Sequence, residues 1–258
     1  MERLKQDRSH GISSNAVRTW GMLFVVAGVV GRGIIQTHIL NMGAISTQQL
    51  LEAMQSSTAV MAMATVSIVL QAMETCAIPI FCFLLVEGFQ HTKDFKQYFL
   101  RVLGIALISE IPYNLAFGGT FFDLGSRNPV FSMVLCLVVL YFYRRYAEKS
   151  AGNTAVKAVV TVAALLWGGM LNIDSGVCCV LVTSVLWASR KQPNYRAFAG
   201  CAAAALCSVS SPFYLAAPMG FMAVHFYNGE KGPENRVVNY LAYPCLLLMA
   251  GIAGAFLL

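Results

Sequence analysis

Three charged side chains lie in or beside apolar runs within one stretch of the chain, residues 79–117. They are Glu87, Arg101 and Glu110, and the stretch reads PIFCFLLVEGFQHTKDFKQYFLRVLGIALISEIPYNLAF. A segment this apolar is typical of a bilayer, where an ionisable group is costly and its usual role is functional. These three groups are therefore the first candidates for chemistry.

The carboxylate of Glu110 has two roles open to it. It lies two residues before Pro112, which loosens a helix and frees a backbone carbonyl. The carboxylate either forms a structural pair with a cation such as Arg32 or Arg127, or it accepts a proton or orients a substrate.

A histidine and a second carboxylate are the other candidates for proton transfer. His225 ends an apolar run in MAVHFYNGEKG and is either an interfacial aromatic-belt residue or a general base, because imidazole titrates near neutral pH. Glu87 lies near the end of its own run and is either an interfacial residue or the group that organises His91 and His225. We take Glu87, Glu110 and His225 as the candidate catalytic residues.

The polar residues fall into two belts, one toward each side of the membrane, and each belt suggests a ligand. One belt is basic and suits the phosphates of a cytosolic donor, although such residues more often fix membrane orientation. The other belt would face a second substrate from the opposite side, although Arg32 in it could equally snorkel to the interface. The donor-binding candidates are His91, Lys93, Arg101, Asn228 and Lys231. The substrate-binding candidates are Arg32, Asn114, Arg127 and Asp174.

Composition indicates a protein built for the bilayer. The chain is 57% hydrophobic and 12% charged, whereas a soluble domain averages about 25% charged residues. The net charge of +6 comes from short basic groups between apolar runs, which is the pattern of membrane topology signals and argues against nucleic acid.

Cysteines and common catalytic motifs add no metal or nucleotide site. All eight cysteines lie within apolar runs, without a CxxC or a Cys/His ligand spacing, so we expect neither a metal site nor a disulfide framework. No Walker A, GxGxxG, HExxH or GxSxG motif is present.

Apolar runs long enough to cross or enter a membrane predict about nine transmembrane helices. The run 58–89 is longer than one perpendicular crossing needs, so it is either one long broken span or a shallow helix followed by a span. The amphipathic piece TQQLLEAMQ precedes it. The predicted spans are 17–35, 58–89, 95–117, 129–143, 154–171, 176–188, 198–209, 213–226 and 237–258.

The basic residues orient these spans. With 58–89 counted once, all but Arg32 and Arg127 of the 18 Lys and Arg residues fall on one side. Positive loops stay in the cytoplasm, so we expect a cytoplasmic tail over 1–16 and a single transmembrane domain over 17–258 in the cell membrane.

Several segments resemble the TraX family. The stretch 79–117 follows a pattern close to P-hydrophobic-FLLVEGF-HT, a basic turn, then ALISEIP and a polar Asn or Asp. FYNGEKG followed by YLAYP resembles a second TraX block, and IDSGVCCVL is a looser match, so the resemblance covers most of the chain from about residue 80. The shared motif positions are Glu87, Gly88, His91, Glu110, Pro112, Asn114, Asp174, Asn228, Gly229 and Gly232.

The resemblance implies acyl transfer, with one departure. The family is named for a pilin N-terminal acetylase and looks related to membrane acyltransferases that use cytosolic acetyl-CoA. Such relatives carry an Asp-His pair in the first span, the His being the expected base, and a second His in the last span. Here Gly28 and Val29 stand at the pair and Leu246 at the second His, and none of these can take a proton.

We therefore expect an all-α integral membrane protein that transfers an acetyl group from acetyl-CoA, without a metal, to a small-molecule, lipid or peptide acceptor. The alternative is a non-enzymatic transporter or binding module on the same scaffold, because the Asp-His pair is replaced by Gly28 and Val29. A lipid-binding or assembly protein is a third interpretation. The lipid bilayer is the expected partner, and the sequence does not indicate an oligomeric state.

Overall fold

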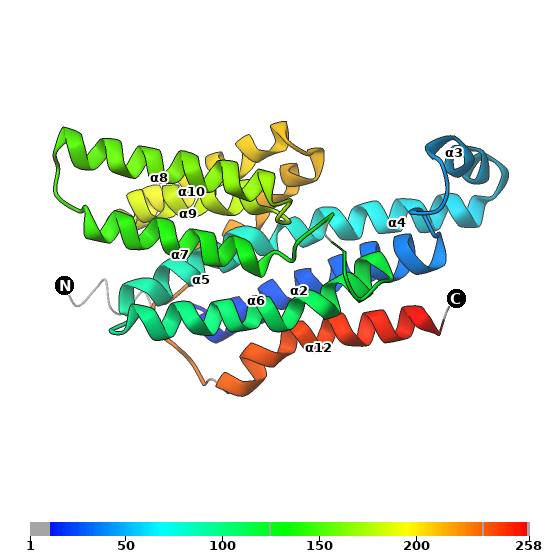
Figure 1. The fold of residues 1–258 in the computed structure, drawn as a ribbon, viewed down its shortest axis with the longest axis horizontal. Coiled ribbons are helices and arrows are strands. Elements are labelled where there is room, and N and C mark those ends of the chain that lie inside the picture. The colour runs from blue at the N-terminus through cyan, green and yellow to red at the C-terminus, as the bar shows by residue number, and fades with distance from the viewer. Residues whose placement is uncertain (1–10, 124, 234, 257–258) are drawn as a thin grey trace.

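A computed structural model describes residues 11–123, 125–233 and 235–256 of the chain. Every regular element in these residues is a helix, and the remaining β-structure consists of two isolated bridges. Most helices run along the long axis of the molecule and lie side by side as a bundle (Figure 1). The all-α fold predicted from the sequence is confirmed.

The first half of the described chain contains a pair of consecutive elements, α2 and η2, of which η2 is wound as a π-helix. A short amphipathic helix, α3, follows this pair. The elements are α2 (Ser14–Gly28), η2 (Val29–Ile39), α3 (Thr47–Ser56), α4 (Thr58–Thr75), α5 (Ala77–His91) and α6 (Phe95–Gly118).

The second half contains six α-helices among the described residues, with two 3₁₀ segments, η3 and η4, between α10 and α11. The elements are α7 (Val130–Arg145), α8 (Ala151–Met170), α9 (Gly176–Ala188), α10 (Pro193–Leu206), η3 (Cys207–Val209), η4 (Pro212–Gly220), α11 (Phe221–His225) and α12 (Arg236–Ala255).

Five helical stretches among the described residues are long and apolar enough to cross a membrane. The chain is therefore a multi-pass membrane protein, as predicted. The total of nine spans and the cytoplasmic position of the N-terminus remain predictions. The five stretches are Ser14–Ile39, Thr58–His91, Phe95–Gly118, Ala151–Met170 and Val237–Ala255.

The first span is longer than the predicted range 17–35. It begins after Ser13, whose side chain caps the first turn of α2, and it continues through the π-helix η2 to residue 39. Within η2, Thr37 Oγ1 donates a hydrogen bond of 2.9 Å to the backbone carbonyl of Arg32. Segments of π-helix are rare and often occur at functional sites, so η2 is a position to inspect for polar contacts.

The run 58–89 forms one long broken stretch, Thr58–His91, which is the first of the two predicted alternatives. The break between α4 and α5 falls at Cys76 and not at Pro79. Pro79 lies in the first turn of α5, where a missing backbone N–H costs no helical hydrogen bond. The two helices lie nearly in line (Figure 1).

The predicted ranges 198–209 and 213–226 differ from the structure. The first helix begins earlier, at Pro193, and the second is not a continuous apolar helix, because η4 and α11 share it. Pro212 and Pro218 lack amide hydrogens and cannot continue an α-helical ladder. The other predicted spans after 58–89 agree with α6, α7, α8, α9 and α12 to within about three residues at each end.

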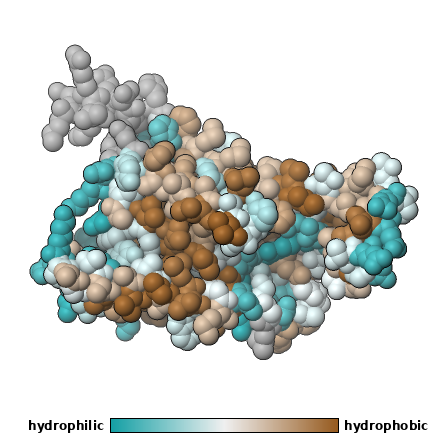
Figure 2. Space-filling model, turned by 90° about the horizontal axis from the view of Figure 1, so that it is seen from above, coloured by the Kyte–Doolittle hydropathy of each residue, from teal (hydrophilic) through white to brown (hydrophobic). Residues whose placement is uncertain are grey.

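Two apolar clusters hold the bundle together. The larger contains Phe83 and Phe89 of α5 with Leu140 of α7 and Leu186 of α9, all fully buried. The smaller joins α2, η2, α6 and α12 and includes Val29. Other large apolar side chains are exposed, and Figure 2 shows such residues over the middle of one face with hydrophilic residues toward its two ends. An apolar belt between polar ends suits a lipid bilayer.

The connections between helices divide into two ends along the long axis (Figure 1). One end carries basic side chains in each connection, and we call it the basic end; the positive-inside rule predicts that it faces the cytoplasm. The other is called the opposite end. The connections at the basic end are 92–94, 146–150, 189–192 and 226–235, and those at the opposite end are 40–46, 119–129 and 171–175.

Candidate functional site

A cavity of about 650 Å³ lies between α2, α5, α6, α7, α12 and the connection 226–235, with its polar part at the basic end. We call it the basic-end cavity. Its walls are apolar where it reaches into the bundle, at Val25, Phe81 and Met133, and polar near the connections. The polar lining residues include Arg18, Glu87, His91, Tyr98, Arg101, Lys231, Asn239 and Tyr240.

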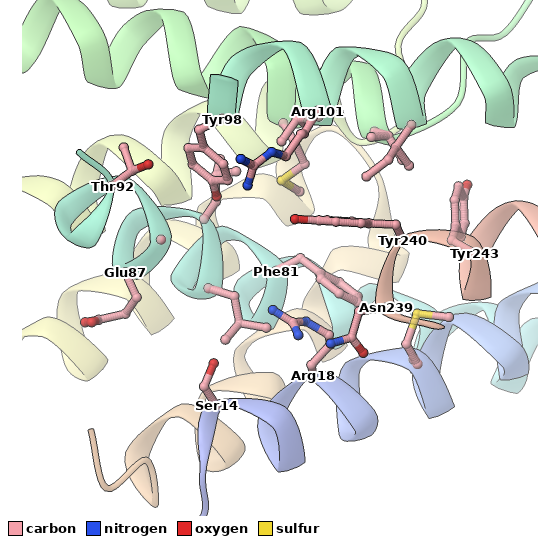
Figure 3. Close-up of a pocket in the computed structure, with 18 of the residues that line it drawn as sticks. Ser14, Arg18, Phe81, Glu87, Thr92, Tyr98, Arg101, Asn239, Tyr240 and Tyr243 are labelled. Carbon is pink, nitrogen blue, oxygen red and sulfur yellow. The ribbon is translucent and has the colours of Figure 1, made fainter. Parts of the chain in front are cut away.

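Cations from separate helices converge on the basic-end cavity. Figure 3 shows Arg18 extending from α2 and Arg101 from α6, with the ring of Tyr240 of α12 lying between them in this view. Arg101 Nη2 donates to Gln97 Oε1 at 3.0 Å, which holds the guanidinium in place. Positive groups at the rim of an apolar cavity concentrate anionic ligands, so this arrangement suits a ligand with a phosphate head and an apolar tail.

Backbone pairing between residues 11–14 and the connection 226–235 forms part of the rim of the cavity. Ile12 forms an isolated parallel bridge with Tyr227, and the Ser14 amide donates to the Glu230 carbonyl at 2.8 Å. Asn228 Nδ2 donates to the Gly11 carbonyl at 3.3 Å. The predicted donor-binding residue Asn228 therefore shapes this rim, whereas the predicted Lys231 lines the cavity itself.

Glu87 lines the basic-end cavity and is already paired. Its Oε1 lies 3.0 Å from Arg196 Nη1, and the Arg196 guanidinium lies over the ring of Phe83. His91 Nδ1 lies 3.8 Å from Glu87 Oε2, so the structure brings together two of the predicted residues. His225 is exposed at the end of α11 and is not among the residues that line the cavity, so the predicted grouping around it is not seen.

The remaining predicted donor-binding residue, Lys93, is exposed in the α5–α6 connection and also lies outside the cavity lining. Arg18 and Tyr240 line the cavity but were not candidates from the sequence. Arg18 lies four residues before Met22 on the same helix face, and this position places it over the cavity.

Toward the opposite end, Arg32 of η2 meets Asp174 from the α8–α9 connection. Arg32 Nη2 lies 2.7 Å from Asp174 Oδ2 and 3.0 Å from the hydroxyl of Tyr113. Tyr113 also donates to Asp174 Oδ2 at 3.0 Å and contacts Ser126 Oγ at 3.0 Å. The predicted substrate-binding residues Arg32 and Asp174 thus form one polar cluster, with Ser175 Oγ as a further donor to the carboxylate.

Asp174 is ionised in this cluster. Burial opposes its negative charge, but the Arg32 guanidinium and hydrogen bonds from Arg32, Tyr113 and Ser175 outweigh that effect and lower the pKa of Asp174 below its usual value. A second cavity, of about 420 Å³, lies beside the cluster and is lined in part by Ser126, Ser175 and Tyr214.

Glu110 is paired with Arg127, which is one of the two cations that the sequence suggested. Arg127 Nη1 lies 3.2 Å from Glu110 Oε1, and Asn128 donates to Oε2 from its side chain at 2.6 Å and its backbone at 3.2 Å. A carboxylate with these donors fixes the connection 119–129 to α6. The predicted Asn114 is buried nearby on α6, and no described group hydrogen-bonds its Oδ1.

Glu74 is a further carboxylate near these groups, and it was not among the candidates predicted from the sequence. Glu74 lies in the last turn of α4, and a Cβ atom built at Gly28 would overlap its carboxyl group. Among the described residues no side chain or amide donates a hydrogen bond to this carboxylate, while Arg32 and Asp174 lie within electrostatic range. Its position inside the apolar run 58–89 was a signal of a functional group.

Comparisons with known proteins give the family. The family model described as TraX protein matches residues 54–253. The chain belongs to the TraX family. A probable fimbrial assembly protein FimC, serogroup H1, of Dichelobacter nodosus is 26% identical over an alignment that covers 70% of this chain and 80% of that relative. No solved structure matches the chain.

The TraX match contains most of the basic-end cavity. It includes the lining residues from α5, α6, α7 and α12 and leaves out only those from α2. The first span, with Gly28 and Val29, therefore lies outside the match. Among the described residues of this TraX protein, no three His, Cys, Asp or Glu side chains lie close enough to hold a metal ion.

Proposed function

We propose that this TraX protein transfers an acetyl group from acetyl-CoA, bound in the basic-end cavity, to an acceptor that enters from the opposite end. The observation that carries the proposal is the cavity itself: cations from α2, α6 and the connection 226–235 at its rim, and apolar walls leading into the bundle. The phosphates of CoA fit the cations, and its slender thioester arm fits the apolar part.

The position of the polar cluster supports acceptor entry from the opposite end. Arg32, Tyr113 and Asp174 lie there beside the second cavity, whose lining hydroxyls hydrogen-bond to the cluster. The relative from Dichelobacter nodosus is named a probable fimbrial assembly protein. That name supports an exported protein as the acceptor, with a peptide amine as the acetylated group, in preference to a small molecule or a lipid.

The first test uses the full chain in lipid nanodiscs. Acetyl-CoA is titrated by calorimetry, and CoA release is then followed with water and with a short peptide carrying a free N-terminal amine as acceptors. Saturable binding with CoA release supports the proposal. Absence of acetyl-CoA binding overturns it.

A non-enzymatic transporter or binding module is the second candidate function. Val29 and Leu246, at the positions where relatives are expected to carry histidines, pack in the same apolar cluster with Val25 and Leu247 and offer no proton acceptor. Proteoliposomes that show solute or proton flux without CoA release, and that lose the flux in Glu110→Gln, would select this function.

A further inference from the structure

Glu74 occupies the space that a side chain at position 28 would take. A Cβ built at Gly28 would fall on Glu74 Cδ and Oε2, so the glycine makes room for the carboxyl group at the contact between α2 and α4. The carboxyl group has no hydrogen-bond donor among the described residues. Glu74 is half-buried, and an unpaired carboxylate within an apolar run is a candidate for a functional group.

The other carboxylates near the two cavities are already paired. Glu87 is bonded to Arg196 and Glu110 to Arg127. Asp174 takes the direct ion pair with Arg32. Glu74 interacts with the Arg32 guanidinium only at longer range. The negative charge of Glu74 is therefore less well neutralised than that of Asp174, and its oxygens can accept a proton.

Glu74 is not among the residues that line the basic-end cavity, but two lining residues lie near it. Tyr243 of α12 lines that cavity and is within electrostatic range of Glu74. Val25 lines it too, and Gly28 follows Val25 by just under one helical turn. In Figure 3, Tyr243 lies at the end of the cavity away from Glu87 and Thr92. The thioester of a ligand that enters past Thr92 would therefore point toward Glu74.

We propose that Glu74 is the general base of the acetyl transfer, an inference that rests on the proposed function. The acceptor amine or hydroxyl attacks the thioester carbonyl of acetyl-CoA while Glu74 takes the proton from the attacking atom. The carbon–nitrogen or carbon–oxygen bond forms, the carbon–sulfur bond breaks, and the departing thiolate takes up a proton from Glu74. The products are the acetylated acceptor and free CoA.

With Glu74 as the base, Gly28 has a role, because it leaves space for the carboxyl group. The apolar residues at the expected histidine positions are then compatible with catalysis. Val29 and Leu246 need not supply a base, because a carboxylate from α4 lies against the neighbouring Gly28. Arg32 attracts the Glu74 carboxylate electrostatically, and no hydrogen bond between the two side chains is seen among the described residues. The groups that face Glu74 electrostatically are Arg32, Asp174 and Tyr243.

The test compares acetyl-CoA binding and CoA release for Glu74→Gln, Gly28→Ala and the matched control Glu52→Gln, which changes an exposed carboxylate of α3. The full chain is used in nanodiscs, with acetyl-CoA as donor and water or the amine peptide as acceptor. General bases contribute about 100-fold to 10,000-fold, so we expect a kcat loss of that size in Glu74→Gln with binding unchanged. The methyl group added in Gly28→Ala displaces the Glu74 carboxyl group, so this variant should also have a lower kcat.

The outcomes separate the two proposals. Wild-type protein that binds no acetyl-CoA overturns the proposed function. Active wild type with equal turnover in Glu74→Gln overturns the base assignment alone, as does loss of binding together with turnover, which would show a structural role. If Glu74→Gln does not fold, unchanged kcat in folded Gly28→Ala overturns the assignment.

Discussion

Arg32 Nη2 lies 2.7 Å from Asp174 Oδ2, although the two residues are 142 positions apart in the chain. The pair joins the π-helix η2 to the α8–α9 connection. The same connection bridges to the segment before α7, where the Arg127 amide donates to the Asn172 carbonyl at 2.9 Å. The ion pair and this backbone hydrogen bond together join three separate parts of the bundle at the opposite end.

Removing the anion of this pair should destabilise the protein. Asp174→Asn leaves the Arg32 guanidinium largely without compensation in a mostly buried site, and we expect a loss of about 1–3 kcal/mol. Thermal unfolding in detergent measures the loss, with Glu148→Gln at an exposed site as the control. Arg32→Gln and the double variant Arg32→Gln/Asp174→Asn complete a double-mutant cycle. An interaction free energy near zero in this cycle would contradict a direct interaction between the two side chains.

The same pair predicts how stability depends on pH. Because the pKa of Asp174 is lowered in the folded protein, its contribution is complete above the unfolded-state pKa, about 3.9, and is lost as pH falls through the folded-state value. Thermal unfolding between about pH 6 and pH 3 should show a steeper decline for the wild type than for Asp174→Asn. Parallel curves for the two proteins would show that Asp174 is not the group responsible.

Arg101 should contribute to acetyl-CoA binding. Its guanidinium lies in the wall of the basic-end cavity, and a hydrogen bond to a charged group is worth about 1.5–3 kcal/mol, or roughly 10-fold to 100-fold in Kd. Calorimetry on Arg101→Ala in nanodiscs should show a loss of this size. Lys149→Ala, an exposed cation in a connection at the same end, should leave Kd unchanged, and equal losses in both variants would indicate only a general charge effect.

Glu87→Gln separates a structural carboxylate from a catalytic one. The Glu87–Arg196 pair has side chains only 19% and 16% exposed, and the guanidinium also packs on Phe83. Breaking the pair leaves an uncompensated cation, so the melting temperature should fall. Turnover per folded molecule should remain close to the wild-type value. A large kcat loss at unchanged melting temperature would restore Glu87 as a catalytic candidate.

Helix positions could be predicted from the sequence where the signal is local. The lengths of the apolar runs predicted the bounds of α6, α8 and α9 to within a few residues. The basic residues Lys93, Lys149 and Lys191 lie in connections at one end of the bundle. The amphipathic piece before 58–89 forms α3, with Ser46 and Gln49 in a reciprocal capping box. These features depend on residues close in the chain.

Pairings between distant elements could be predicted only in part. Glu110 was expected to meet Arg32 or Arg127, and it meets the cation 17 positions away. Arg32 and Asp174 were each singled out, but their contact depends on how η2 packs near the α8–α9 connection, which no local pattern specifies. Glu74 was visible as a carboxylate in an apolar run. Its contact with Gly28 could not be predicted, because that contact depends on how α4 packs against α2.

Gly220 tests the packing at the break between α4 and α5. A Cβ at this residue would overlap the Cys76 carbonyl, which is backbone and cannot rotate away. Gly220→Ala should therefore cost about 1–3 kcal/mol by overpacking, or several degrees of melting temperature at about 2–4 °C per kcal/mol.

Gly104, on α6, is the matched control for Gly220. No atom lies within 4 Å of a Cβ built there. Gly104→Ala should be neutral or stabilising by about 0.5–1 kcal/mol, because alanine loses less backbone entropy in a helix than glycine. Because η4 reaches the helix break through Gly220, equal melting temperatures for the two variants would contradict close packing of η4 at Cys76.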